Sequence, residues 1–108
     1  MMKFTMNAKE LKTMMDKAVT VVNKKVPVPS LKRLYFSVDD KGVLKILSTD
    51  IEHYIEVRTQ DAYHTEPGMF GIDIEDIKII SKMSGEITIE DITTGEEEKI
   101  NIKCGKKN

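Results

Sequence analysis

The first third of the chain changes from a strand pattern to a helix pattern. Residues 3–6 predict a short strand, and Asn7 with Glu10 three residues later is typical of a helix N-cap. Apolar side chains then recur at three- and four-residue spacing, which predicts a helix that extends to about Val22 and buries one face. The apolar residues of that face are Leu11, Met14, Met15, Ala18, Val19 and Val22.

Three antiparallel strands are expected after this helix. Pro27 and Pro29 prevent the helix from continuing, so residues 23–30 are predicted to form a loop. Apolar and polar residues alternate over residues 34–38 and again over 43–49, with a turn between them, which predicts a hairpin. The same period of two over residues 51–57 predicts a third strand with one face in the core.

The second half of the chain repeats this order. Pro67 and Gly68 break the chain, a strand restarts over residues 69–72, and Asp73 is expected to cap a second helix. The expected inward residues of that helix are Ile74, Ile77, Ile80 and Met83. Two further strands are predicted around residues 86–92 and 99–104, the last with Ile100, Ile102 and Cys104 facing the core.

Residues 4–12 align with residues 70–78 through a strand end, a helix cap and the first buried helical position. The sequence therefore predicts an α+β fold of two β-α-β-β-β units, with two helices side by side on antiparallel sheet. The second unit has no counterpart of residues 51–59, so its last strand is expected to be absent. Residues 1–108 are expected to form a single domain.

The charge balance limits the function classes. The 108 residues include 17 basic and 18 acidic side chains, which give a net charge of −1. This excludes a strongly basic DNA-coating protein, so any attraction to nucleic acid must come from a local patch. The lone Cys104 favours a reducing, cytoplasmic setting, and no signal peptide or membrane segment is recognised.

No group of residues predicts an active site or a metal site. Asp50, Glu52, His53 and Glu56 invite such an interpretation, but strand alternation places His53 on the face opposite Glu52 and Glu56. His64 is expected to be exposed, and Asp91 with residues 96–98 lacks the spacing of a calcium loop. Gly68 and Gly71 lack the third glycine of a phosphate-binding loop. No catalytic residue, metal or cofactor is therefore predicted.

Several short segments together resemble a known family. They are Met2-Lys3-Phe4-Thr5, Glu10-Leu11, Ser48-Thr49-Asp50-Ile51-Glu52, Glu66-Pro67-Gly68 and Cys104-Gly105-Lys106. In this order they resemble the N-terminal domain of the bacterial DNA sliding clamp, the beta subunit of DNA polymerase III. The resemblance covers essentially the whole chain.

The resemblance implies a clamp fold and a non-catalytic processivity function in DNA replication. Clamps of this family are homodimeric rings of six such domains that encircle duplex DNA without sequence specificity and tether DNA polymerase III. Polymerase and clamp loader would be bound through domains that this chain does not contain. The residues then expected to contact the DNA backbone are Lys9, Lys12, Lys17, Lys24, Lys25, Lys78 and Lys82.

Two observations keep an alternative open. Asp73, Glu75 and Asp76 open the second helix, where the family usually has small and basic residues, and they would repel phosphate. The missing last strand lies at the joint between subunits in the family, so this chain is not expected to close a ring. A stand-alone interaction module with the clamp fold is the alternative function, and lysines that serve only solubility are the alternative for the predicted DNA contacts.

Overall fold

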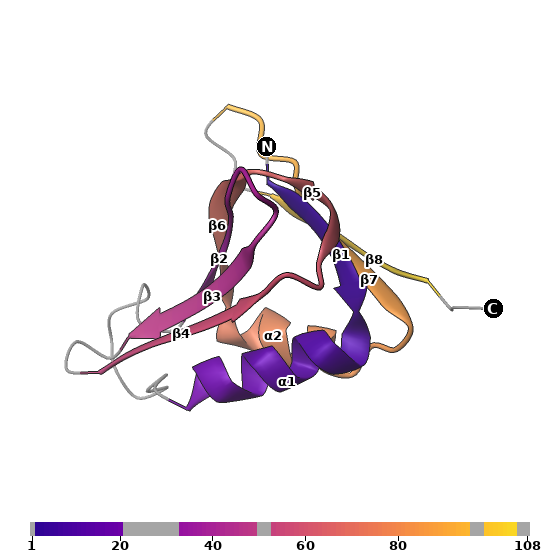
Figure 1. The fold of residues 1–108 in the computed structure, drawn as a ribbon. Coiled ribbons are helices and arrows are strands. Elements are labelled where there is room, and N and C mark those ends of the chain that lie inside the picture. The colour runs from indigo at the N-terminus through magenta and orange to yellow at the C-terminus, as the bar shows by residue number, and fades with distance from the viewer. Residues whose placement is uncertain (1, 21–32, 50–52, 96–98, 106–108) are drawn as a thin grey trace.

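The computed structural model describes residues 2–20, 33–49, 53–95 and 99–105, which form two helices and eight strands (Figure 1). In chain order these are β1 (Lys3–Asn7), α1 (Ala8–Val19), β2 (Arg33–Val38), β3 (Leu44–Thr49), β4 (Tyr54–Thr59), β5 (Tyr63–Glu66), β6 (Gly68–Asp73), α2 (Ile74–Ile80), β7 (Glu86–Asp91) and β8 (Ile100–Gly105). Neither described helix has the length and apolarity needed to cross a lipid bilayer.

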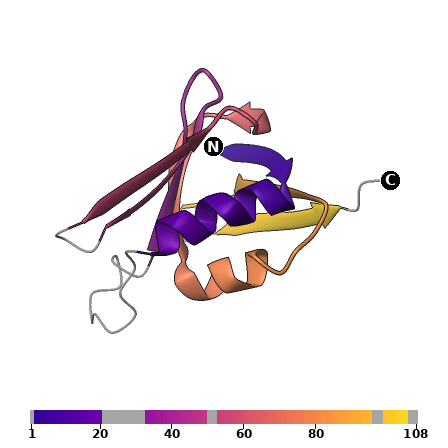
Figure 2. The same ribbon diagram turned by 60° about the horizontal axis from the view of Figure 1, so that its bottom comes forward.

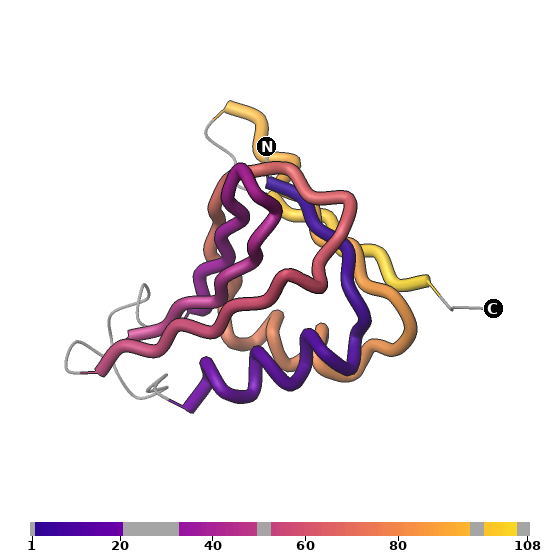
Figure 3. The backbone as a smooth tube through the Cα atoms, viewed as in Figure 1, coloured from indigo at the N-terminus to yellow at the C-terminus, as the bar shows by residue number. Residues whose placement is uncertain are grey.

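The strands form two antiparallel sheets that share the two repeats of the chain. Sheet A has the order β5-β1-β7-β8 and sheet B has the order β4-β3-β2-β6. The first strand of each repeat pairs with the strand that follows the helix of the other repeat: Phe4 lies opposite Ile89, and Phe70 lies opposite Phe36. The tube in Figure 3 shows β1 beside β7 although they are far apart in the sequence.

Both helices cover the inner sides of these sheets. Figure 2 shows α1 and α2 next to each other on the same side of the molecule, and residues of the two helices are in contact. The buried stripe of α1 packs on strands of both sheets, whereas α2 packs on β6 and β2. The two sheets and the helix layer therefore enclose one apolar core.

Three phenylalanine rings join the repeats at the centre of that core. Phe36 stacks on Phe4 at a centroid distance of 6.0 Å and on Phe70 at 5.7 Å. Phe4 and Phe70 are the aligned residues of the two repeats, so one ring of β2 is shared by both. Such stacked pairs contribute about 0.5–1.5 kcal/mol each beyond their buried area.

The predicted helix caps are confirmed, but α1 is shorter than expected. The Asn7 carboxamide oxygen accepts hydrogen bonds from the backbone N–H groups of Lys9 and Glu10, and Asp73 caps α2 through the N–H of Glu75. The prediction that the first helix extends to Val22 is wrong, because α1 ends at Val19. The Thr20 hydroxyl bonds the carbonyl oxygen of Lys17, a local alternative to continuing the helix. Residues 21 and 22 lie outside the described residues.

β4 and α2 also differ slightly from the predicted ranges. The strand pattern expected from residue 51 is seen as β4, which starts at Tyr54, with Ile55 and Val57 half-buried and Arg58 exposed. Residues 51 and 52 are not described. α2 ends at Ile80, and Met83 packs against the core from the following loop.

β5 was not predicted from the sequence. Tyr63–Glu66 pairs with the outer edge of β1, where Lys3 lies opposite Glu66 and Thr5 opposite Tyr63. The four residues of β5 are largely exposed and carry no apolar alternation, so periodicity could not reveal the strand. The first repeat thus contains five strands, and the described part of the second repeat lacks counterparts of both β4 and β5, one strand more than expected.

The prediction that β8 faces the core is only partly right. Ile100 and Ile102 are half-buried and pack against the core, but Cys104 is exposed. β8 is the last strand of sheet A, and within the described residues no strand pairs with its outer edge. The inward side of β8 is therefore less covered than that of an interior strand.

Candidate nucleic-acid interface

The outer face of α1 presents the first group of predicted DNA contacts. Lys9, Lys12 and Lys17 are exposed, because the opposite face of the helix is the apolar stripe that packs on the sheets. Within the described residues, none of the three ammonium groups forms an ion pair. These three charges are therefore available to an anionic partner.

The two lysines around α2 differ from those of α1. The Lys78 ammonium nitrogen lies 3.3 Å from a carboxylate oxygen of Glu75, one helical turn earlier. Lys82 is exposed in the loop that follows the helix. Because the Lys78 charge already has a local partner, its attraction to a phosphate is reduced.

The acids at the start of α2 stabilise the helix and weaken its attraction to phosphate. Asp73 caps the helix, and Glu75 and Asp76 lie in its first turn, where negative charge interacts favourably with the helix dipole. α1 carries three lysines against Glu10 and Asp16, whereas residues 73–82 carry two lysines against three acids. The positive part of the predicted DNA face is therefore on α1.

The structure brings part of the predicted set together. A shallow pocket of about 420 Å³ lies between the start of α1 and the loop after α2, and is lined by Asn7, Ala8, Lys9, Lys12, Met83, Ser84 and Gly85. A hydrogen bond of 2.8 Å from the Ala8 N–H to the Gly85 carbonyl oxygen fixes this loop to α1. Lys82 directly precedes the loop, while Lys17 lies near the opposite end of α1. Lys24 and Lys25 lie outside the described residues.

The alternative metal or catalytic site around β4 is not assembled. Glu56 accepts hydrogen bonds from Arg58 and from the Tyr54 hydroxyl on the same strand. In the part of the chain that the structure describes, no group of His, Cys, Asp and Glu side chains is arranged to hold a metal ion. Asp50 and Glu52 are not described. The available geometry thus gives Glu56 a role in a solvated strand face.

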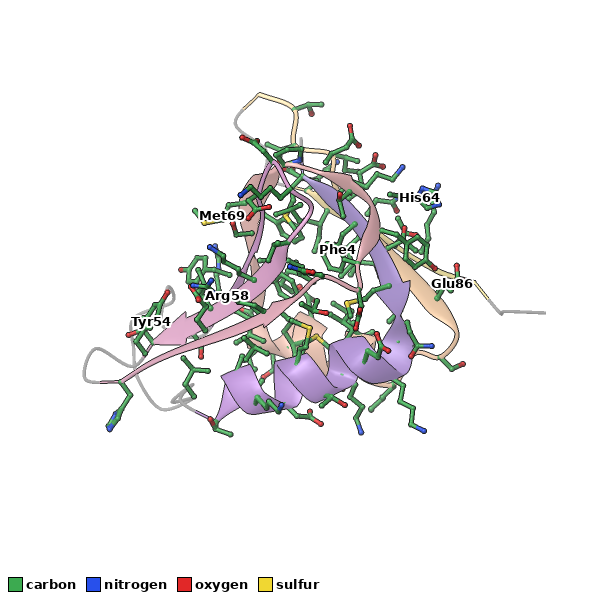
Figure 4. All side chains as sticks on the ribbon, viewed as in Figure 1. Phe4, Tyr54, Arg58, His64, Met69 and Glu86 are labelled. Carbon is green, nitrogen blue, oxygen red and sulfur yellow. The ribbon has the colours of Figure 1, made fainter. Side chains whose placement is uncertain are left out.

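The other residues considered from the sequence have local structural roles. His64 is exposed as predicted, and its ring meets the Tyr63 ring edge-on at 5.1 Å (Figure 4). The Asp91 carboxylate accepts hydrogen bonds from the N–H and hydroxyl of Thr93, which lowers the pKa of Asp91. Gly68 and Gly71 are both part of β6 and form no loop. Residues 96–98 lie outside the described residues.

One contact of this surface was not anticipated from the sequence. The Tyr63 hydroxyl on β5 is hydrogen-bonded to the Glu86 carboxylate on β7, which raises the pKa of Tyr63. The two residues flank β1 from opposite sides, so the contact ties three strands of sheet A together. It could be found only from the strand order, since the two residues are far apart in the chain.

The solved structures that resemble this chain are bacterial sliding clamps. The clamp of Caulobacter crescentus matches with a TM-score of 0.83 at 19% identity, over 99% of this chain and 29% of that one. The Pseudomonas aeruginosa clamp, DNA polymerase III subunit beta, matches with 0.82 at 23% identity, over 98% and 28%. The Bacillus subtilis clamp matches with 0.83 at 19% identity, over 98% and 29%.

These likenesses establish the clamp fold, and the chain spans less than a third of the length of each clamp. No curated protein matches the sequence. A family model, that of the DNA polymerase III beta subunit N-terminal domain, matches residues 2–108. Since this match covers nearly every residue, the chain belongs to the family of the DNA polymerase III beta subunit N-terminal domain.

Proposed function

We propose that this chain acts in DNA replication as the N-terminal domain of a sliding clamp, a processivity factor that encircles duplex DNA and holds DNA polymerase III on it. The family match over residues 2–108 carries this proposal. The row of unpaired lysines on α1 supports it, because such a surface can attract the DNA backbone. The role is non-catalytic, since tethering a polymerase requires no bond to be made or broken.

The charge on this surface suits a protein that slides. Each lysine that neutralises a phosphate releases a counterion, so affinity falls as salt rises. α1 offers three lysines with two acids among them, which favours weak, sequence-independent attraction over tight binding. A more basic surface would hold the ring in one place on the duplex.

The remaining partners follow from the clamp proposal. Duplex DNA would pass the helix face, and polymerase and clamp loader would bind domains outside residues 1–108. We further infer a homodimeric ring for the longer protein of which this chain would be one domain. A cytoplasmic setting fits the single Cys104, which has no second cysteine with which to form a disulfide within the chain.

The test is DNA binding by the chain in low salt, measured by fluorescence anisotropy with labelled duplexes of different sequence. We expect weak binding that is insensitive to sequence. Lys12→Glu and Lys25→Glu should weaken it and each reduce the salt dependence by about one counterion. Lys41→Glu, in the exposed β2–β3 turn away from both helices, is the charge-matched control. Equal binding by all three variants would disprove the assigned DNA face.

A second function is favoured by one observation, the three acids at residues 73, 75 and 76. A helix that repels phosphate would suit a stand-alone interaction module that keeps the clamp fold without encircling DNA. The gene sequence after the codon for Asn108 separates the two proposals. A reading frame that continues for about two further domains supports the clamp, and a stop codon supports the module.

A further inference from the structure

The two repeats differ in how well their third strands are covered. β8 of the second repeat corresponds to β3 of the first, because β7 pairs with β8 as β2 pairs with β3. The inward residues of β3 are Leu44, Ile46 and Ser48, and all three are buried. The inward residues of β8 are Ile100, Ile102 and Cys104, of which two are half-buried and one is exposed.

The first repeat shows what kind of segment would cover β8. β3 is covered on its outer edge by the antiparallel strand β4, with Val57 directly opposite Ile46. β8 pairs with no strand on that edge within the described residues, so its backbone N–H and C=O groups there are available to a new strand. By the correspondence of the repeats, an antiparallel strand with an apolar residue opposite Ile102 would complete sheet A.

β8 itself meets this requirement. In an antiparallel pair of two β8 strands centred on Ile102, that residue lies opposite its own copy and Ile100 lies opposite Cys104. All the half-covered inward side chains then face one another. We propose that the 108-residue chain forms a two-fold symmetric dimer in which β8 pairs with β8 of a second copy, joining the two A sheets into one.

The charges on the outward side of β8 select this register. With Ile102 at the axis, Lys103 lies opposite Asn101 of the second copy. A register centred on Lys103 would place two lysines directly opposite each other, and one centred on Asn101 would place Lys103 opposite Lys99. Like charges at directly opposed positions are unfavourable, so the Ile102 register is the one without such a pair.

The dimer is tested by sedimentation equilibrium of the chain and of two variants at Asn101. Asn101→Lys places a lysine opposite Lys103 of the second copy and should shift the protein toward monomer. Asn101→Glu places a carboxylate there and should shift it toward dimer. Within one chain Asn101 lies opposite Glu90, so the two variants should change the stability of the fold in the reverse order. Gln60→Lys, an exposed site after β4, is the control for added charge.

Disulfide trapping then tests the register, in a Cys104→Ala background under oxidising conditions. Ile102→Cys should form a cross-linked dimer by itself, because directly opposed Cα atoms lie about 4.5–5.5 Å apart. Asn101→Cys and Lys103→Cys should each cross-link poorly alone and efficiently when mixed. Their outward positions make these two variants informative even if Ile102→Cys fails to fold.

A chain that stays monomeric at the highest attainable concentration, with no cross-link at any of the three positions, would overturn the proposal. Cross-linking of Lys103→Cys alone would overturn the register. The dimer does not depend on DNA binding, so loss of binding in Lys12→Glu leaves this test unaffected. In a longer polypeptide the same edge would be open to a following strand of the same chain, which would compete with the dimer.

Discussion

The Ser48 hydroxyl on β3 donates a hydrogen bond of 2.5 Å to the carbonyl oxygen of Ala18 in the last turn of α1. Carbonyl groups in the last turn of a helix have no partner within the helix, and both of these residues are buried. This contact therefore supplies a partner that water cannot reach. It also fixes the end of α1 to sheet B.

Replacing Ser48 by alanine should leave the Ala18 carbonyl buried and unsatisfied. We expect the free energy of unfolding to fall by about 1–3 kcal/mol. Urea denaturation followed by circular dichroism measures this loss. Ser37→Ala, on the outward side of β2, makes the same chemical change at a half-buried site and should alter stability much less. Equal effects of both substitutions would argue against the role given to Ser48.

Replacing Gly68 by alanine should destabilise the domain. Its φ of 149° is rare for residues with a side chain, and an added Cβ would lie 2.9 Å from the Met2 Cβ and 3.0 Å from the Met2 backbone nitrogen. We expect a loss of about 1–3 kcal/mol in thermal or urea unfolding. Gly105→Ala is the matched control, since an added Cβ there meets no atom within 4 Å. A stable Gly68→Ala variant would show that β6 can move away from Met2.

The Asp91 carboxylate should make stability depend on pH. The hydrogen bonds from Thr93 hold the pKa of Asp91 below its ordinary value of 3.8, so the ionised carboxylate is favoured in the folded state. Its contribution is complete above 3.8 and is lost as the pH falls further. Urea midpoints at neutral and acid pH should therefore differ less in Asp91→Asn than in the wild type.

Asp40→Asn removes a carboxylate from the β2–β3 turn and serves as the control for that measurement. Its urea midpoints should keep more of the wild-type pH dependence. If Asp91→Asn and the wild type lost the same stability in acid, Thr93 would not be favouring the ionised form of Asp91.

Glu75→Gln should strengthen DNA binding if α2 contributes to the DNA face. The substitution removes one negative charge and releases Lys78 from its ion pair. A single exposed charge is worth up to about 1 kcal/mol, so we expect a gain of about two- to fivefold in low salt. Anisotropy titrations measure it, with Glu66→Gln on the exposed strand β5 as the control. A gain of the same size in the control would indicate a net-charge effect only.

Most local structure could be predicted from the sequence because it depends on neighbouring residues. The apolar stripe of α1, the cap at Asn7 and the turn at Asp39 all follow from spacing over a few positions. The exposure of Lys9, Lys12 and Lys17 followed from the same stripe. The ion pair between Glu75 and Lys78 is also local, at a spacing of three residues, and could have been predicted.

The arrangement of the strands could not be predicted in this way. β1 pairs with β7 through contacts such as the 2.8 Å hydrogen bond between the Thr5 and Thr88 hydroxyl groups, and no local pattern encodes that choice of partner. β5 is short, polar and exposed, so it carries no apolar signal. The low burial of Cys104 follows from the place of β8 at a sheet edge, which the strand order alone reveals.

The exchange of first strands between the repeats has a consequence for how the chain acquires its fold. When residues up to about the end of β4 have been synthesised, β1 has neither of its partners and β2 has only one, so only the three-stranded part β2-β3-β4 can form. Sheet A cannot begin to form until β5 and β7 are available. Pairings across such long stretches of sequence slow folding, because much of the chain must be ordered before they form. The domain should therefore fold as one cooperative unit, late in its own synthesis, and a fragment ending after β4 should not fold.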